Sequence, residues 1–176
     1  FEGPLQIGAA FRLSGPKYPM ATVSLPLSSS LFVAAYSANY SNAREGADAA
    51  VNQFPWVGQY VGGGQYEVNQ AFAGFDTSQI PNGSTITSAK LIVQIAERYG
   101  SIILEARSSD WTAGSAASFV PGSQLASKPM LGGVLINAGG AATYEIDLSD
   151  VTRENMAKMG DMQGCGDPAG GGTGQD

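Results

Sequence analysis

Residues 85–97, TITSAKLIVQIAE, give the clearest indication of the fold class of this chain. Its side chains alternate between apolar and polar with the period of two that a β-strand imposes, so one face of the strand is apolar. That face carries Ala89, Leu91, Val93 and Ile95. A turn at 98–101 leads into a second alternating segment, 102–107, and two such segments joined by a short turn predict an antiparallel hairpin.

Segments with strand character continue on both sides of this hairpin, separated by stretches rich in Gly, Pro and Ser. They are residues 5–13, 21–27, 31–36, 57–61, 66–75, 134–136 and 144–148. Asp150 is typical of a helix N-cap and Gly160 of the residue that ends a helix, so one short helix is expected between them. The sequence therefore predicts an all-β fold, an antiparallel β-sandwich with one short C-terminal helix.

The length of 176 residues is that of one sandwich domain with short flanking segments. We expect residues 1–20 to be an N-terminal extension or an extra strand, residues 21–160 to be the domain, and residues 161–176 to be a Gly-rich tail. The tail has too little apolar surface to offset the entropy lost on ordering, so the sequence predicts that it is flexible.

Six short segments of the chain form an ordered series. They are Asn39–Asn42 (NYSN), Val57–Gly58, Ala71–Asp76 (AFAGFD), Ile80–Leu91 (IPNGSTITSAKL), Asp110–Thr112 (DWT) and Tyr144–Leu148 (YEIDL). In this order they resemble DNRLRE-type jelly-roll modules, and the likeness covers roughly residues 22–151. The resemblance implies an antiparallel jelly roll of a kind that occurs beside secreted polysaccharide-processing enzymes, on cell surfaces and in phage particles.

The chain departs from that family at both ends. The family module ends in a final strand after the helix, whereas this chain has its Gly-rich tail there, and a sheet short of one strand exposes unpaired backbone groups. At the other end, residues 5–13 add a strand with an apolar face. This assembly strand carries Leu5, Ile7, Ala9, Phe11 and Leu13. It is expected to fill the open edge, in its own subunit or in a neighbour, or else to be an ordinary first strand.

The chain lacks the residues that several classes of function require. With no histidine and one cysteine, the chain has no Ser-His-Asp or Cys-His set and little means of holding zinc. A net charge of -6 disfavours nucleic acid and anionic membranes, and no apolar run is long enough to span a bilayer. A carboxylate pair of the glycosidase type is conceivable, but the strand glutamates occupy solvent-facing positions. We therefore predict a protein that is not an enzyme.

Two kinds of binding site have candidate residues. Exposed aromatic rings stack on sugars, and the aromatic residues near predicted loops are Trp56, Tyr60, Tyr66, Tyr99 and Trp111. Of these, Trp56, Tyr60 and Tyr66 are the candidate carbohydrate contacts, although core packing is the alternative for every aromatic residue and the expectation for Trp111. Calcium, the one candidate cofactor, prefers oxygen ligands. Its candidates are Asp76, Asp110 and Asp147, and for Asp76 and Asp147 the alternative is to accept hydrogen bonds from backbone N–H groups.

Two functions follow from these features. The first is a structural or assembly module on a virion or extracellular surface, such as a phage decoration, head-fibre or tail component or a filament subunit. It would assemble through sheet-edge contacts, with copies of itself or with another virion or surface protein. The alternative is a carbohydrate-binding module whose partner is a polysaccharide and for which calcium is the candidate stabilising ion.

Overall fold

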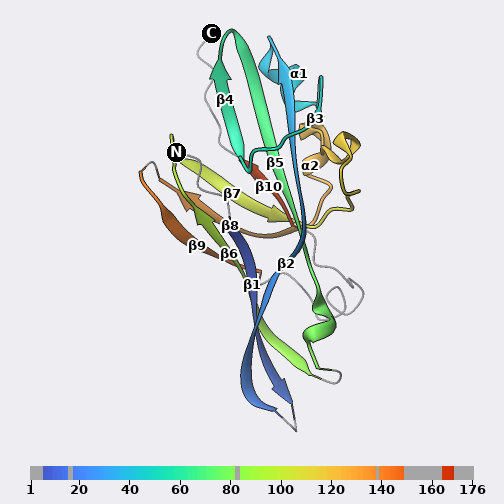
Figure 1. Ribbon diagram of the computed structural model, residues 1–176, viewed down its shortest axis with the longest axis vertical. Helices are drawn as coiled ribbons and strands as arrows, with labels where there is room; N and C mark the ends of the chain where they lie inside the picture. Colours follow the sequence, from blue (N-terminus) through green and yellow to red (C-terminus); the bar gives the residue numbers. More distant parts are fainter. Residues whose placement is uncertain (1–5, 16–17, 82–83, 138, 149–163, 169–176) are drawn as a thin grey trace.

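Figure 1 shows the computed structural model of the chain, which describes residues 6–15, 18–81, 84–137, 139–148 and 164–168. The strands are β1 Gln6–Gly15, β2 Tyr18–Ser37, β3 Ala50–Val51, β4 Gly58–Gly62, β5 Gln65–Phe75, β6 Thr85–Ile95, β7 Ile102–Arg107, β8 Met130–Ile136, β9 Ala142–Asp147 and β10 Gly164–Pro168. The helices are short: α1 Tyr40–Arg44, α2 Gly122–Leu125 and the 3₁₀ turns η1 Thr77–Gln79 and η2 Ala116–Ser118.

The predicted all-β, antiparallel class is confirmed, and no helix of the described residues is long and apolar enough to cross a membrane. The helix predicted at 150–160 lies outside the described residues.

The strands form one curled sheet rather than two separate layers. Its order is β8-β7-β10-β5-β2-β1-β6-β9, with β3 added to β2 and β4 added to β5. Strand β2 joins the two halves, because residues up to Pro26 pair with β1 and residues from Leu27 onward pair with β5. Its long course through the molecule can be followed in Figure 1.

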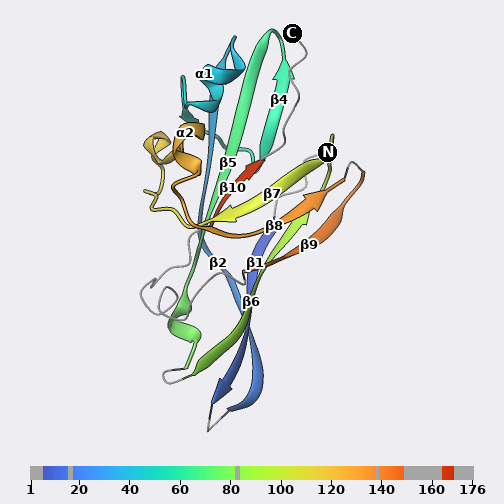
Figure 2. The same ribbon diagram turned by 180° about the vertical axis from the view of Figure 1, so that it is seen from behind.

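The two edge strands of the sheet, β8 and β9, come together and make the sheet a half-barrel (Figures 1 and 2). They meet at Gly132, where a Cβ atom would lie 2.1 Å from the carbonyl oxygen of Asp147. Such a separation is far below van der Waals contact, so this close approach of two backbones requires glycine.

The core fills the inside of the curl. The apolar face predicted for residues 85–97 lies there, with Ala89, Leu91 and Val93 buried and Ile95 packed at the margin. On the opposite face Lys90 points outward and bonds to Glu145, with 2.6 Å between nitrogen and oxygen. The alternation of the sequence therefore predicts the orientation of β6 correctly.

The N-terminal segment is an interior strand of its own chain. β1 pairs with β2 on one side and with β6 on the other. Ala9, Phe11 and Leu13 are each 1% exposed in the core, Ile7 packs against it, and Leu5 lies outside the described residues. The assembly strand thus lies inside the sheet that its own chain forms, between β2 and β6.

The C-terminal segment differs from its prediction. We expect a flexible tail from residue 161, but residues 164–168 form β10 between β5 and β7. Gly166, for example, lies opposite Ala71 on one side and Ala106 on the other. Backbone hydrogen bonds to two existing strands need no apolar side chain, which explains why composition failed to predict this strand. Residues 161–163 and 169–176 lie outside the described residues.

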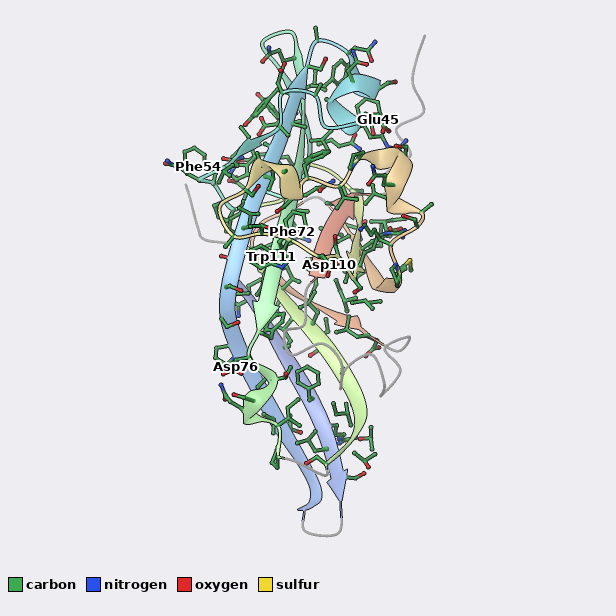
Figure 3. All side chains as sticks on the ribbon, turned by 90° about the vertical axis from the view of Figure 1, so that its right-hand side faces the viewer. Glu45, Phe54, Phe72, Asp76, Asp110 and Trp111 are labelled. Atoms are coloured by element: carbon green, nitrogen blue, oxygen red, sulfur yellow. The ribbon has the colours of Figure 1, made fainter. Side chains whose placement is uncertain are left out.

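A second cluster of buried residues lies where the loop between β7 and β8 folds over β2 and β5. Phe72 and Trp111 lie side by side in it, with ring centroids 6.0 Å apart (Figure 3). Gln70, 1% exposed, fixes this loop with both ends of its amide: Nε2 donates to the Val120 carbonyl (2.7 Å) and Oε1 accepts from the Val120 N–H (2.9 Å). Trp111, expected in the core, is thus partly buried and packs against this cluster.

Candidate functional site

A pocket of about 490 Å³ opens beside β4 and the turn that joins β6 to β7. Aromatic and aliphatic side chains make up most of its lining. They are Phe54, Pro55, Trp56, Val57, Tyr60, Val93, Ile95, Tyr99, Ile102, Leu104 and Ile136, and polar residues join them at Gln53, Gln59, Asn69, Glu97 and Arg98. A concave, mostly apolar pocket with a few polar groups is the usual form of a small-molecule site.

Three exposed aromatic rings gather at this pocket. Trp56 stacks with Tyr99, with centroids 6.4 Å apart and 27° between the planes, and meets Tyr60 edge-on at 6.5 Å. Trp56 is 44% exposed, Tyr60 is 53% exposed and Tyr99 is 79% exposed. Large aromatic side chains are highly buried on average, so a cluster with this exposure has surface to offer a ligand.

The backbone before β4 sets the position of Trp56. The Phe54 N–H donates to Oδ1 of Asn52 at 3.0 Å, and the Trp56 N–H donates to the Phe54 carbonyl at 2.9 Å, which makes a tight turn. Gly58 follows with φ +127, a conformation that other residues rarely adopt. The turn and the glycine together hold Trp56 at the pocket instead of in the core.

Tyr99 is fixed by its neighbours in the turn after β6. Its hydroxyl donates to the Glu97 carboxylate at 2.7 Å, and this hydrogen bond is the main reason why the pKa of Tyr99 is raised. The intervening Arg98 attaches the turn to the β8–β9 hairpin. Its backbone exchanges two hydrogen bonds with Gly139, and its guanidinium donates to the Gly140 carbonyl and to the Tyr144 hydroxyl.

Asn69 contributes a polar group to the pocket wall. It lies on β5, opposite Gly58 of β4, and is 2% exposed. Its Oδ1 accepts a hydrogen bond from Nδ2 of Asn52 at 3.0 Å. A buried amide beside an apolar surface is the kind of group that orients a ligand.

The structure brings together two of the three predicted carbohydrate contacts. Trp56 and Tyr60 line the pocket, whereas Tyr66 packs against the second cluster with its ring 5.7 Å from that of Tyr40. Tyr99 takes the third place, as one of the aromatic residues near predicted loops. Asn69 was missed, because nothing in the sequence of β5 distinguishes an amide at a pocket from one facing solvent.

The three calcium candidates do not form a common site. Asp76 accepts a hydrogen bond from the Ser78 N–H at 2.9 Å, its bonds with Ser78 lower the pKa of its carboxyl, and Figure 3 shows it well separated from Asp110. Asp147 lies on β9, 3.9 Å from the Lys90 ammonium. In the part of the chain that the structure describes, no three acidic or cysteine side chains gather as metal ligands. The Asp76 carboxylate thus takes the alternative role expected for it, accepting from a backbone N–H.

The pocket and the sheet are the features from which function is inferred. Comparison of the chain with protein-family models, with curated proteins and with solved structures gives no match.

Proposed function

We propose that this protein is a non-catalytic carbohydrate-binding module whose site is the aromatic pocket. The observation that carries the proposal is the group of three exposed rings, Trp56, Tyr60 and Tyr99, at the mouth of an apolar hollow of about 490 Å³. The C–H groups of a pyranose make an apolar face, and aromatic side chains present a large, rigid surface that such a face can cover. Hydroxyl groups around the sugar then need the few polar groups that the pocket wall supplies.

The strand order supports the finer classification as a jelly roll. The strand order is β2-β1-β6-β9 in one half of the curled sheet and β5-β10-β7-β8 in the other. In a jelly roll of eight antiparallel strands, the last strand lies beside the first, inside its sheet. We propose that β1 occupies that place here, so that the strand comes first in the sequence instead of last. We also propose a relationship to DNRLRE-type modules. A fold alone does not identify a ligand.

Loss of the Trp56 ring tests the carbohydrate proposal. We expect the wild-type protein to bind members of an immobilised panel of neutral oligosaccharides, and Trp56→Ala to weaken that binding at least about tenfold, since a central aromatic contact carries much of a site's affinity. Titration calorimetry on the best ligand measures the change. Leu135→Ala, which removes an exposed apolar side chain outside the pocket lining, is the control. Equal affinities of wild type and Trp56→Ala would contradict the assignment of the site.

A second candidate is the assembly module of a virion or extracellular surface. Apolar side chains are exposed on β7 and on the edge strand β8, where Ile103 lies opposite Leu135 and these residues are 43% and 58% exposed. An edge strand with apolar neighbours suits contact with another sheet. This candidate predicts an oligomer in solution, and light scattering during size-exclusion chromatography would detect it. A mass of one subunit across the concentration range would count against it.

A further inference from the structure

The side chain of Asn69 has a fixed orientation in the pocket wall. The Phe54 N–H can only donate, so the Asn52 atom that it meets at 3.0 Å is the carbonyl oxygen Oδ1. Asn52 therefore turns its Nδ2 toward Asn69, and the Asn69 atom that accepts from it at 3.0 Å is again the oxygen. A backbone group thus determines both amide orientations, which the side chains alone would leave open.

This orientation leaves the Nδ2 group of Asn69 as a donor. Among the described residues, the bond from Asn52 is the one hydrogen bond of the Asn69 side chain. The residue is 2% exposed and lines the pocket, so its two N–H bonds have the pocket as their route to an acceptor. This donor is not one of the buried side-chain atoms that lack a partner, which among the described residues are Ser84 Oγ and Trp111 Nε1. It is therefore open to the pocket, and a ligand that offers an oxygen atom there gains affinity and selectivity.

The charged residues of the pocket are engaged with the protein itself. Arg98 is the one basic residue of the lining, and its guanidinium donates to the Gly140 carbonyl and the Tyr144 hydroxyl while lying 5.6 Å from the centre of the Tyr144 ring. Glu97 accepts from the Tyr99 hydroxyl. No basic side chain of the described lining is free to pair with a carboxylate or sulfate, so the pocket suits an uncharged ligand.

We infer that Asn69 is a specificity-determining donor, and that the pocket takes a neutral pyranose sugar. The sugar lies with its apolar face on the Trp56 and Tyr99 rings and directs a hydroxyl or ring oxygen at Nδ2 of Asn69. This inference rests on the proposed function, because it names the ligand class and the polar contact of the same site.

The test exchanges the donor for an acceptor. Asn69→Asp keeps an oxygen for Asn52 to bond and removes both N–H groups, at almost the same side-chain volume. Gln65→Glu places the same charge on an exposed residue of the same strand, outside the pocket lining, and is the matched control. Calorimetry with neutral gluco-, galacto-, manno- and xylo-oligosaccharides, and with oligogalacturonate and alginate fragments as acidic probes, is run on each protein. Asn69→Ala, which has no side-chain donor, provides a second variant should the aspartate not fold.

We expect a neutral oligosaccharide to be preferred, and Asn69→Asp to weaken its binding at least about tenfold while Gln65→Glu changes it little. On the wild-type protein, monodeoxy analogues of that sugar should lose affinity at one hydroxyl position, and Asn69→Ala should remove this dependence. Unchanged affinity of Asn69→Asp, together with loss in Trp56→Ala, would overturn the role of Asn69 and leave the carbohydrate site standing. Preference for the acidic fragments would overturn the ligand class. Failure of every sugar to bind the wild type would overturn the proposed function itself.

Discussion

Single side chains hold the long loop between β7 and β8 against the sheet. Gln70 clamps Val120 from β5, and the Glu45 carboxylate accepts from the Ser123 N–H (2.9 Å) and hydroxyl (2.5 Å). The sequence reveals the composition of such a loop but not these contacts, because the partners are separated by 50 and 78 residues. Trp56 was predictable as an aromatic residue in a loop after Phe54-Pro55. The orientation of the Asn69 amide, in contrast, depends on a hydrogen bond from Asn52, which lies in a different segment.

Replacement of Gln70 should reveal the strength of this clamp. We expect Gln70→Leu to lower the free energy of unfolding by about 2–4 kcal/mol, because it leaves the buried N–H and carbonyl of Val120 without their partner. Urea unfolding measures the change. Gln65→Leu, on an exposed residue of the same strand, is the control and should shift stability by less than about 0.5 kcal/mol. Equal effects of the two substitutions would show that the clamp contributes nothing.

Strands differ in how well their own sequence predicts them. β6 and β1 carry a clear alternation, and both lie with the predicted face in the core. β10 has no such pattern: its five residues GCGDP gain their strand conformation from β5 and β7 on either side. The neighbours, not the local propensity, determine this element.

A proline in β10 should expose that dependence. Gly166 lies inside the sheet with a partner on each side, and proline there removes a backbone donor and restricts φ. We expect Gly166→Pro to lower the free energy of unfolding by about 1–3 kcal/mol, as measured by chemical denaturation. Removal of residues 169–176 leaves β10 in place and serves as the comparison. Stability unaffected by the proline would mean that the sheet does not need this strand.

At the scale of the molecule, the closure of the curl is the feature that alternation could not predict. The sequence indicates many antiparallel strands, and a sandwich is the usual arrangement for them. Whether the sheet separates into layers or curls depends on local contacts between distant strands, such as Gly132 against Asp147. Gly-Gly at 132–133 reads as a loop in the sequence, but it lies within β8.

Adjacent glycines provide a matched test of the closure. A Cβ at Gly132 would lie 2.1 Å from the Asp147 carbonyl oxygen, whereas at Gly133 the nearest atom, the Leu104 carbonyl oxygen, would be 3.4 Å away. We therefore expect Gly132→Ala to destabilise the protein by about 1–3 kcal/mol through overpacking, and Gly133→Ala to cost clearly less. Thermal melts followed by circular dichroism compare them. A larger effect at Gly133 would contradict the close approach of β8 and β9.

The course of β2 has a consequence for how the molecule comes apart. Its 20 residues supply hydrogen-bonding partners to β1 in one half and to β5 in the other, with no break in the chain between them. If one half of the sheet unfolds, β2 is disturbed, and the other half then loses backbone hydrogen-bonding partners as well. Heat should accordingly drive a single cooperative transition, so that the molecule behaves as one thermodynamic unit in spite of its two-part shape.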